Sequence, residues 1–238
     1  MLHFDSMKVN SLSVFFPAFN EEKNIAATVV RADEVLKNLK LKNYEIIVVN
    51  DGSSDKTAEV VLKLAQKNSH IRLVNHQRNR GYGGALKTGF SQSKYEWVAF
   101  ADSDGQFDFA DIKKFLAEAE NADLVLGFRI KRADSLFRQL TTFGWKTIAR
   151  IFLGLDVKDY SCGFKLIKKQ VYDAVLPLVG EEKVTQIEML VKAKRLGFKF
   201  AEVGVPHYPR KFGTQTGANL KVVFKSIIDL FKLWWKIR

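Results

Sequence analysis

The chain has a single cysteine and no long apolar run. Cys162 is alone among 238 residues, so no intramolecular disulfide can form, and we expect it to be a small buried residue in a reducing compartment. No stretch offers the roughly 18 consecutive apolar residues that a membrane-spanning helix needs. Residues 1–6 lack the basic start and apolar core of a signal peptide. We therefore expect a cytoplasmic protein that meets a membrane only peripherally or through an integral partner.

Acidic residues are scarce relative to basic ones. The chain has 38 Lys and Arg against 26 Asp and Glu, which gives a formal net charge of +12. Such an excess favours anionic partners, namely nucleotides, nucleic acids or an acidic membrane surface. The hydrophobic content of 47% suffices for a packed core. The length fits one large α/β domain or two small ones.

Two phosphate-binding fingerprints are missing from the glycine-rich segment 80–89. Leu86 stands where a dinucleotide-binding GxGxxG would need glycine, and it also stands before Lys87, where a Walker loop would need glycine. These absences count against a NAD enzyme and a P-loop ATPase. Arg80, Gly81 and Lys87 leave two interpretations open: a close backbone approach to a diphosphate, or a tight turn.

Short apolar runs alternate with helical patterns along the chain. Strands are expected at 12–16, 44–49, 70–75, 96–101, 123–127, 164–167 and 199–205, with Pro17 ending the first of them. Helices are expected at 20–40, at about 56–67, and at 81–91, 135–155, 183–196 and 218–238. This alternation predicts an α/β fold whose mainly parallel sheet is covered by helices on both faces. Ligands of such sheets bind beyond the carboxyl ends of the strands.

An acidic pair follows one of these strands directly. Asp102 and Asp104 come after the apolar run 98–101, and Gln106 follows two residues later. Side chains two apart at a strand end can converge, and converging carboxylates repel unless a cation lies between them. Mg²⁺ is the usual cation, since it takes oxygen ligands and keeps positions open for substrate phosphates. The alternative is a polar turn that caps the next helix.

Four segments in the first half resemble family 2 glycosyltransferases. They are residues 16–22, 49–55, 79–85 and 101–106. The second half is similar to the branch that contains dolichol-phosphate mannose synthase and other polyprenyl-phosphate glycosyltransferases, in segments 127–129, 159–165, 186–189 and 208–213. The resemblance implies an A-type glycosyltransferase fold, with a Rossmann-like nucleotide-binding half. It also implies two lobes of one domain, a nucleotide-sugar lobe at 1–130 and an acceptor lobe at 131–217, which are followed by a basic interfacial helix that the residue pattern predicts at 218–238.

The resemblance also implies roles for individual residues. The nucleotide sugar would be bound by Pro17, Ala18, Phe19, Glu21, Asp51, Arg80, Gly81, Lys87, Asp102 and Ser103, with Asp51 accepting hydrogen bonds from the base. Asp102, Asp104 and Gln106 would hold Mg²⁺ or Mn²⁺ against the diphosphate. Catalysis would depend on Asp104, Arg129, Arg210 and Glu188, and the acceptor would meet Ser161, Lys165 and Arg210. Glu188 is left open as a base, as a partner of Arg210 or as an ordinary helix-surface carboxylate.

This sequence departs from the family pattern in two places. Phe19 stands where tyrosine is usual, which keeps a stacking face but loses a hydroxyl. No lysine follows the segment Arg210–Gly213 within the next few residues, so a second cationic clamp is not identified. The signature of processive polysaccharide synthases, Gln-x-x-Arg-Trp, is missing.

The resemblance therefore predicts an inverting, metal-dependent transfer of a sugar from a GDP-mannose or UDP-glucose type donor to a polyprenyl phosphate such as dolichyl or undecaprenyl phosphate. An acceptor phosphate is already anionic near neutrality, because its second pKa is about 6, so it needs no general base. One alternative is transfer to a hydroxyl of a soluble glycan, protein or glycolipid. A more remote one is a basic nucleic-acid-binding protein, which would leave the acidic pair unexplained.

Two segments combine lysine or arginine with large apolar residues. In 218–238 the lysines are spaced by four, seven and four residues, which places them on one helical face, and the other face is rich in Trp, Phe, Ile and Leu. Segment 135–155 has the same character. Such helices suit a membrane interface, with each basic group adding about 1 kcal/mol near an anionic surface. Packing against the same domain or a partner, including a small integral-membrane subunit, stays open.

Overall fold

A computed structural model of the chain describes residues 9–130, 154–180 and 184–213. The helices expected at 135–155 and 218–238 lie outside these ranges, apart from Gly154 and Leu155. Within the described ranges, no helix has both the length and the apolar character needed to cross a bilayer.

One seven-stranded sheet organises the described residues, with strand order β3-β2-β1-β4-β6-β5-β7. The strands are β1 (Ser11–Ala18), β2 (Asn43–Asn50), β3 (Ile71–Asn75), β4 (Trp97–Phe100), β5 (Leu124–Arg129), β6 (Lys165–Lys168) and β7 (Phe200–Val205). All neighbours are parallel except β6, which runs antiparallel to β4 and to β5. The predicted mainly parallel sheet is therefore confirmed.

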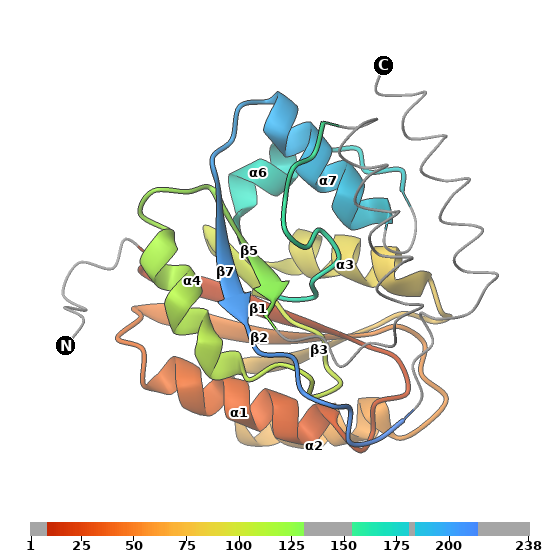
Figure 1. The fold of residues 1–238 in the computed structure, drawn as a ribbon. Coiled ribbons are helices and arrows are strands. Elements are labelled where there is room, and N and C mark those ends of the chain that lie inside the picture. Colours follow the sequence, from red (N-terminus) through yellow and green to blue (C-terminus); the bar gives the residue numbers. More distant parts are fainter. Residues whose placement is uncertain (1–8, 131–153, 181–183, 214–238) are drawn as a thin grey trace.

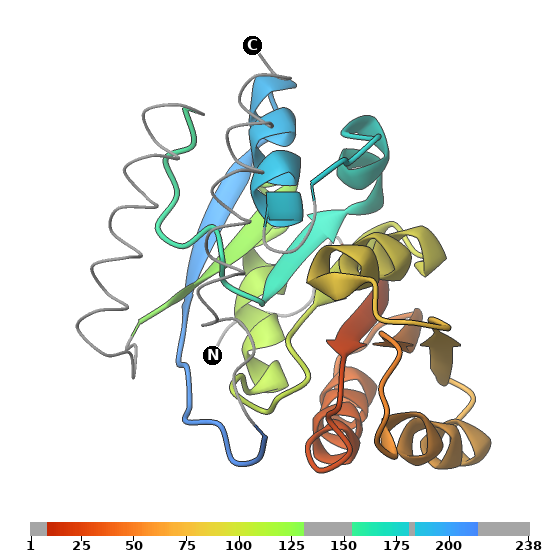
Figure 2. The same cartoon turned by 90° about the vertical axis from the view of Figure 1, so that its right-hand side faces the viewer.

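Helices cover both faces of this sheet (Figure 1). They are α1 (Ile25–Lys37), α2 (Thr57–Lys67), α3 (Gly81–Gln92), the short 3₁₀ helix η1 (Phe109–Asp111), α4 (Ile112–Glu118), α6 (Lys169–Ala174) and α7 (Val184–Arg195). One buried cluster joins the sheet to α1, α2 and α4, and a second joins it to α3, α6 and α7. Figure 2 shows the two helix layers after a 90° turn.

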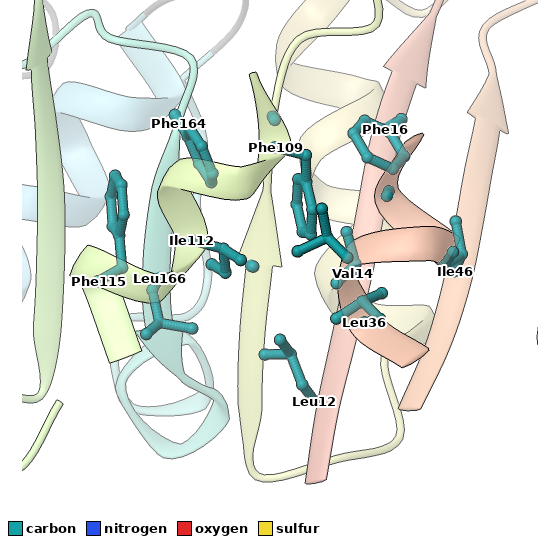
Figure 3. Packing of buried hydrophobic residues seen from close by; sticks show 14 of the residues in the cluster. Leu12, Val14, Phe16, Leu36, Ile46, Phe109, Ile112, Phe115, Phe164 and Leu166 are labelled. Atoms are coloured by element: carbon teal, nitrogen blue, oxygen red, sulfur yellow. The ribbon is translucent and has the colours of Figure 1, made fainter. Parts of the chain in front are cut away.

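Aromatic rings fill much of the first cluster (Figure 3). Phe164, which directly precedes β6, stacks on Phe115 of α4 and on Phe109 of η1, with ring centroids 4.5 and 5.6 Å apart. In the second cluster, Phe15 of β1 lies against Phe100 of β4 at 5.3 Å. These rings are buried, so packing fixes where β4 ends and where the chain approaches β6.

Two predicted boundaries were wrong. Pro17 does not end β1, which continues to Ala18. β1 pairs with β4 only as far as Phe15, so the side of Pro17 that lacks an N–H faces no partner strand there. Helix α1 begins at Ile25 and not at residue 20, because the turn at 21–24 precedes it and Asn20 has a φ of 55°. Glu21 and Glu22 are therefore outside its first turn.

The two expected lobes share one sheet. β6 comes from the second half of the chain, yet it lies between β4 and β5 of the first half. β7 also belongs to the second half and pairs with β5. The sequence did not indicate α4 and α6, two short helices of seven and six residues. The packing is continuous across residue 130. The division into a donor-binding and an acceptor-binding lobe at that residue therefore stays a prediction about which ligand each part binds.

Candidate functional site

Polar side chains gather at the edge of the sheet where the parallel strands end. The turns after β1, β2, β3 and β4 all lie there, as do Arg129 at the end of β5 and the chain leaving β7. Because β6 is antiparallel, its beginning lies at the same edge, which brings 161–165 close to Asp102. The sheet topology thus collects residues that are more than 100 positions apart in the sequence.

Asp102 and Asp104 form the centre of this edge. The Tyr82 hydroxyl donates to Asp102 Oδ1 at 3.0 Å, and the backbone N–H of Gln106 donates to Asp104 Oδ1 at 3.1 Å. Burial, and next to it the charge of Asp102, raises the pKa of Asp104 to about 6. The two carboxylates are therefore close enough to repel each other, which is the electrostatic condition for holding a cation.

Arg210 is held against these acidic groups by the segment after β7. Its Nη2 forms an ion pair with Glu21 Oε1 and lies 3.6 Å from Asp104 Oδ2. The Asn24 amide donates to the other oxygen of Glu21 at 2.7 Å. Burial raises the pKa of Glu21, against the opposing effect of Asn24 and Arg210. Three carboxylates and one guanidinium therefore share a partly buried site.

Gln106 ties the segment after β7 to the acidic turn. Its backbone carbonyl accepts from the N–H of Tyr208, and its side-chain Nε2 donates to the Tyr208 carbonyl, both at 2.9 Å. At the far end of the segment, the Phe212 carbonyl accepts from the Asn24 amide at 3.3 Å. The structure therefore gives the Gln106 amide a backbone partner, and its metal role stays a prediction.

The acidic pair fits a divalent cation of the magnesium type. No group of three or more His, Cys, Asp or Glu side chains that could enclose an ion is present in the described part of the chain. Mg²⁺ in nucleotide sites is characteristically bound by one or two carboxylates, with substrate phosphates and water completing six positions. Two partly buried, mutually repelling carboxylates match that incomplete ligand set.

The turns after β2 and β3 form the neighbouring part of the site. Asp51 Oδ1 contacts Nδ1 of His76 at 2.6 Å and accepts from the backbone N–H of Arg80 at 2.9 Å. His76 Nε2 lies 2.9 Å from the Thr88 hydroxyl. Beside them is an open hollow of about 270 Å³, which is lined by Asn75, His76, Gln77, Arg78 and Arg80. His76 and Arg78 were not predicted from the sequence, although their place directly after a strand end was a usable signal.

The other residues expected to bind the nucleotide sugar have these positions. Pro17 and Ala18 end β1, where their carbonyls accept from the Ser103 hydroxyl at 2.7 Å and from the Asp51 N–H at 2.9 Å. Phe19 follows with 39% of its surface exposed, as a stacking face requires. Gly81 begins α3 with a φ of 76°, a conformation that a side chain would disfavour.

Lys87 contacts the second half of the chain. Its Nζ donates to the Gly180 carbonyl at 2.8 Å, on the connection between α6 and α7. The Thr185 hydroxyl donates to the same carbonyl, also at 2.8 Å. In this arrangement Lys87 joins α3 to the second half of the chain, and its diphosphate contact stays a prediction.

Glu188 is fully buried, so the helix-surface alternative is wrong. Its Oε2 accepts from the N–H groups of Val179 and Gly180 at 2.9 and 2.6 Å. Lys192 Nζ lies 2.8 Å from Oε1, within ion-pair range but outside the angular range of a hydrogen bond. Through these contacts Glu188 fixes the backbone at residues 179–180.

Arg129 is engaged by residues that were expected to lie beside it. Its Nε and Nη2 donate to the two oxygens of Asp159 at 2.7 and 3.1 Å, and Nη2 also donates to the Ser161 hydroxyl at 3.0 Å. Asp159 is buried and Arg129 partly so. The pair brings Ser161 to the carboxyl end of β5, at the same edge of the sheet as the acidic pair.

Lys165 is placed differently from the prediction. The sequence predicted that it meets the acceptor, yet its side chain is completely buried. Nζ donates to the Cys162 carbonyl and to Gln186 Oε1. Burial lowers the pKa of this ammonium to about 8. Cys162 itself is buried, as expected, and burial raises the pKa of its thiol to about 11, which argues against a nucleophilic role.

Comparison with known proteins gives a consistent result. Residues 13–176 match the model of the family described as Glycosyl transferase family 2. The chain is 32% identical over 214 residues to dolichyl-phosphate beta-glucosyltransferase of Dictyostelium discoideum. This match covers 82% of this chain and 65% of the relative. It is 30% identical over 218 residues to undecaprenyl-phosphate 4-deoxy-4-formamido-L-arabinose transferase of Photorhabdus laumondii, covering 91% of this chain and 66% of the relative. The chain thus spans about two thirds of these relatives.

A solved structure supports the fold. Glucosyl-3-phosphoglycerate synthase of Mycobacterium tuberculosis, in complex with Mn²⁺, uridine diphosphate and phosphoglyceric acid, superposes with a TM-score of 0.73 at 22% identity. The match covers 94% of this chain and 78% of the other. At this identity, the likeness is evidence for a shared fold.

Proposed function

Because the chain belongs to glycosyl transferase family 2, the family its motifs predicted, we propose that it transfers a sugar from a nucleotide-diphosphate sugar to a polyprenyl phosphate. The reaction would invert the anomeric centre by direct displacement. The observation that carries the proposal is the pair Asp102 and Asp104 at the end of β4, with Arg210 against Asp104. Its α/β fold, of the A-type glycosyltransferase class, is shared with a solved sugar-transferring enzyme.

In the proposed reaction, a nucleoside diphosphate must leave the anomeric carbon of the donor sugar. A bound Mg²⁺ or Mn²⁺ would supply positive charge where negative charge develops on the leaving diphosphate. Asp102 and Asp104 would hold that ion, with Gln106 as a further candidate. Arg210 is close enough to Asp104 to face the same phosphates, and its fixed guanidinium needs little reorganisation during the reaction.

The donor base would lie toward Asp51 and the hollow beside it. Arg78 and Arg80 line that hollow, and Phe19 offers an exposed ring at the neighbouring strand end. A nucleoside diphosphate combines a flat base with negative charge, which suits an exposed aromatic ring for the base and basic groups for the phosphates. A glucosyl donor of the UDP-glucose type is favoured over GDP-mannose, because the Dictyostelium relative is named a beta-glucosyltransferase.

The acceptor is proposed to be a phosphate and not a hydroxyl. A hydroxyl needs a general base, and Glu188, the candidate for that role, already accepts two backbone hydrogen bonds in the 179–180 turn. A phosphate oxygen is anionic near neutrality. The Dictyostelium and Photorhabdus relatives both carry polyprenyl phosphates in their names. Ser161 and Arg129 at the end of β5 are proposed to face the acceptor, with Arg210 between acceptor and donor.

We also propose that the protein works peripherally on the cytoplasmic face of a membrane. A polyprenyl phosphate resides in a bilayer, and segments 135–155 and 218–238 have the composition of interfacial helices. A small integral-membrane subunit is compatible with this arrangement. Nucleic acid is not an expected partner, since it would leave the acidic pair without a role.

The decisive assay incubates the full chain with labelled UDP- and GDP-sugars and, in separate reactions, with dolichyl or undecaprenyl phosphate in vesicles or with soluble glycan and glycolipid hydroxyl acceptors, each with and without EDTA. Lipid-linked product that disappears with EDTA is expected. Asp104→Ala should abolish transfer, while Asp173→Ala, which removes an exposed carboxylate of α6, should not. Product only with hydroxyl acceptors would establish the alternative transferase, and lipid product that is indifferent to EDTA would remove the metal.

A further inference from the structure

A chain of hydrogen bonds runs from the core to Asp102. Lys165 Nζ donates to Gln186 Oε1, Gln186 Nε2 donates to the Tyr82 oxygen at 3.3 Å, and the Tyr82 hydroxyl donates to Asp102 Oδ1 at 3.0 Å. The four residues come from β6, α7, α3 and the turn after β4. This chain links both halves of the sequence at the acidic pair.

The direction of these hydrogen bonds is chemically fixed. An ammonium group has donors and no acceptor, so Gln186 must turn its oxygen toward Lys165. Its NH₂ group then faces Tyr82 and uses a lone pair of the phenol oxygen. The phenol hydrogen is left to point at Asp102, whose carboxylate can only accept. Every link donates toward the acidic pair, so reversing any one of them would leave two donors or two acceptors face to face.

The network is inaccessible to solvent in its inner part. Lys165 has no exposed surface and Gln186 has 1%. Lys165 Nζ also donates to the Cys162 carbonyl, which fixes the origin of the network on the segment just before β6. Burying a polar group without a hydrogen-bond partner costs free energy. The hydrogen bonds that satisfy Lys165, Gln186 and Tyr82 therefore also hold their side chains in one arrangement.

Gly163 also lies close to the Asp102 carboxylate. A Cβ atom at position 163 would lie 2.0 Å from Asp102 Oδ2 and 2.3 Å from its Cγ. The carboxylate therefore fits into space that any other residue at 163 would fill. With Tyr82 bound to Oδ1 and the Gly163 backbone close to Oδ2, the plane of the carboxylate is restrained.

We propose that Tyr82 and Gln186, anchored by Lys165, are positioning residues that hold the Asp102 carboxylate in the orientation in which it binds the divalent cation. The inference rests on the proposed function, since it concerns the same site. It assigns Lys165, which the sequence placed beside the acceptor, to the support of the metal ligand. Partners behind a ligand commonly change metal affinity by about 10–100-fold when they are removed.

A purely structural network would behave differently. Loss of a hydrogen bond in the core would lower the free energy of unfolding and leave metal affinity unchanged in the folded fraction. Loss of a positioning contact would weaken the metal while the protein stays folded. The distinguishing quantity is therefore the dissociation constant of the ion itself, measured apart from turnover.

The test titrates Mn²⁺ into the full chain with UDP or GDP present and follows unbound Mn²⁺ by electron paramagnetic resonance. Tyr82→Phe keeps the ring and removes the hydroxyl. Tyr44→Phe is the matched control, because the Tyr44 hydroxyl donates to the buried Asp33 at 2.8 Å, away from the site. Thermal unfolding in EDTA accompanies each titration. We expect the Mn²⁺ dissociation constant to rise about tenfold in Tyr82→Phe and to be unchanged in Tyr44→Phe.

A second readout separates kcat from the metal requirement. Saturating Mn²⁺ should restore most of the kcat of Tyr82→Phe, since the ligand is displaced and not removed. Gln186→Met, which breaks the network one step further back, should weaken Mn²⁺ in the same direction and replaces Tyr82→Phe if that variant fails to fold. Folded variants of both kinds with wild-type Mn²⁺ affinity would overturn the inference. A wild-type chain that binds no Mn²⁺ with either nucleotide would instead remove the metal from the proposed function, and the inference with it, while sugar transfer to lipid would remain to be judged by the transfer assay.

Discussion

Arg129 forms a two-bond ion pair with Asp159, with Nε 2.7 Å from one carboxylate oxygen and Nη2 3.1 Å from the other. The pair joins the end of β5 to the segment that leads into β6, and Asp159 is almost fully buried. Such a pair fixes the geometry of the proposed acceptor site, but it also makes stability depend on both partners.

Removing Arg129 should therefore destabilise the protein. In Arg129→Gln, Asp159 becomes a buried charge that has lost its guanidinium, and we expect the free energy of unfolding to fall by about 3 kcal/mol. Urea unfolding measures this loss. Arg31→Gln is the control, because Arg31 makes the same two-bond contact with Asp108 on the surface, where its loss should hardly be measurable. Equal effects of the two variants would contradict the role of burial.

Asp104 should lower stability in the absence of metal. Its pKa of about 6 in the folded protein lies above the ordinary 3.8, so the folded state binds the proton more tightly than the unfolded state. The ionised carboxylate then opposes folding above pH 6, and the penalty fades as the pH falls through 6 toward 4. We expect Asp104→Asn to be more stable than wild type by on the order of 2 kcal/mol at pH 7.5 in EDTA, and to be inactive.

Denaturant unfolding at pH 7.5 and pH 4.5 measures the pH dependence of this gain. The difference between Asp104→Asn and wild type should shrink at the lower pH. The exposed Asp173→Asn provides the comparison, since its side chain is 55% exposed and should show no such gain. A gain that is the same at both pH values would contradict the assignment to Asp104 ionisation.

Glu188 should matter for stability more than for chemistry. Glu188→Gln weakens an acceptor for two backbone N–H groups and removes the ion pair with Lys192, so we expect a loss of about 1–3 kcal/mol. Turnover per folded molecule with a polyprenyl phosphate should change less than tenfold, whereas loss of a general base costs about 10²–10⁴-fold. Steady-state kinetics and unfolding of the same preparation measure both. The exposed Glu59→Gln serves as control.

Gly89 should tolerate no side chain. Alanine in a helix interior is intrinsically favoured over glycine by up to about 1 kcal/mol. At Gly89, however, a Cβ atom would lie 2.3 Å from the ring of Phe15, which is itself packed against Phe90 and Phe100. We therefore expect Gly89→Ala to destabilise by about 3 kcal/mol, measured by thermal unfolding. An unchanged or higher melting temperature would show that α3 can shift on β1.

The control for Gly89 is Gly197→Ala. Gly197 has a φ of 81°, and a Cβ atom there would have no neighbouring atom within 4 Å, so alanine meets backbone strain alone. The expected loss is about 1–2 kcal/mol. A larger loss at Gly197 than at Gly89 would contradict the packing argument.

Local sequence signals placed most strands and located the acidic pair. Apolar runs bounded by polar turns predicted the strand that precedes Asp102, because burial on both faces of a parallel sheet demands continuous apolar residues. The boundaries failed where contacts outside the segment decided. Pro17 stays in β1 because β4 has already ended beside it, and no neighbouring residue in the sequence carries that information.

By itself, the sequence determined the fold class, the family and the strand end that carries Asp102 and Asp104, since these depend on hydrophobic period and on motifs of a few residues. Only the tertiary structure decided that Lys165 lies buried behind Gln186 and Tyr82, and that Glu188 holds a turn. These partners come together because β6 enters the sheet between β4 and β5, and the register of that insertion is set by packing over the whole molecule.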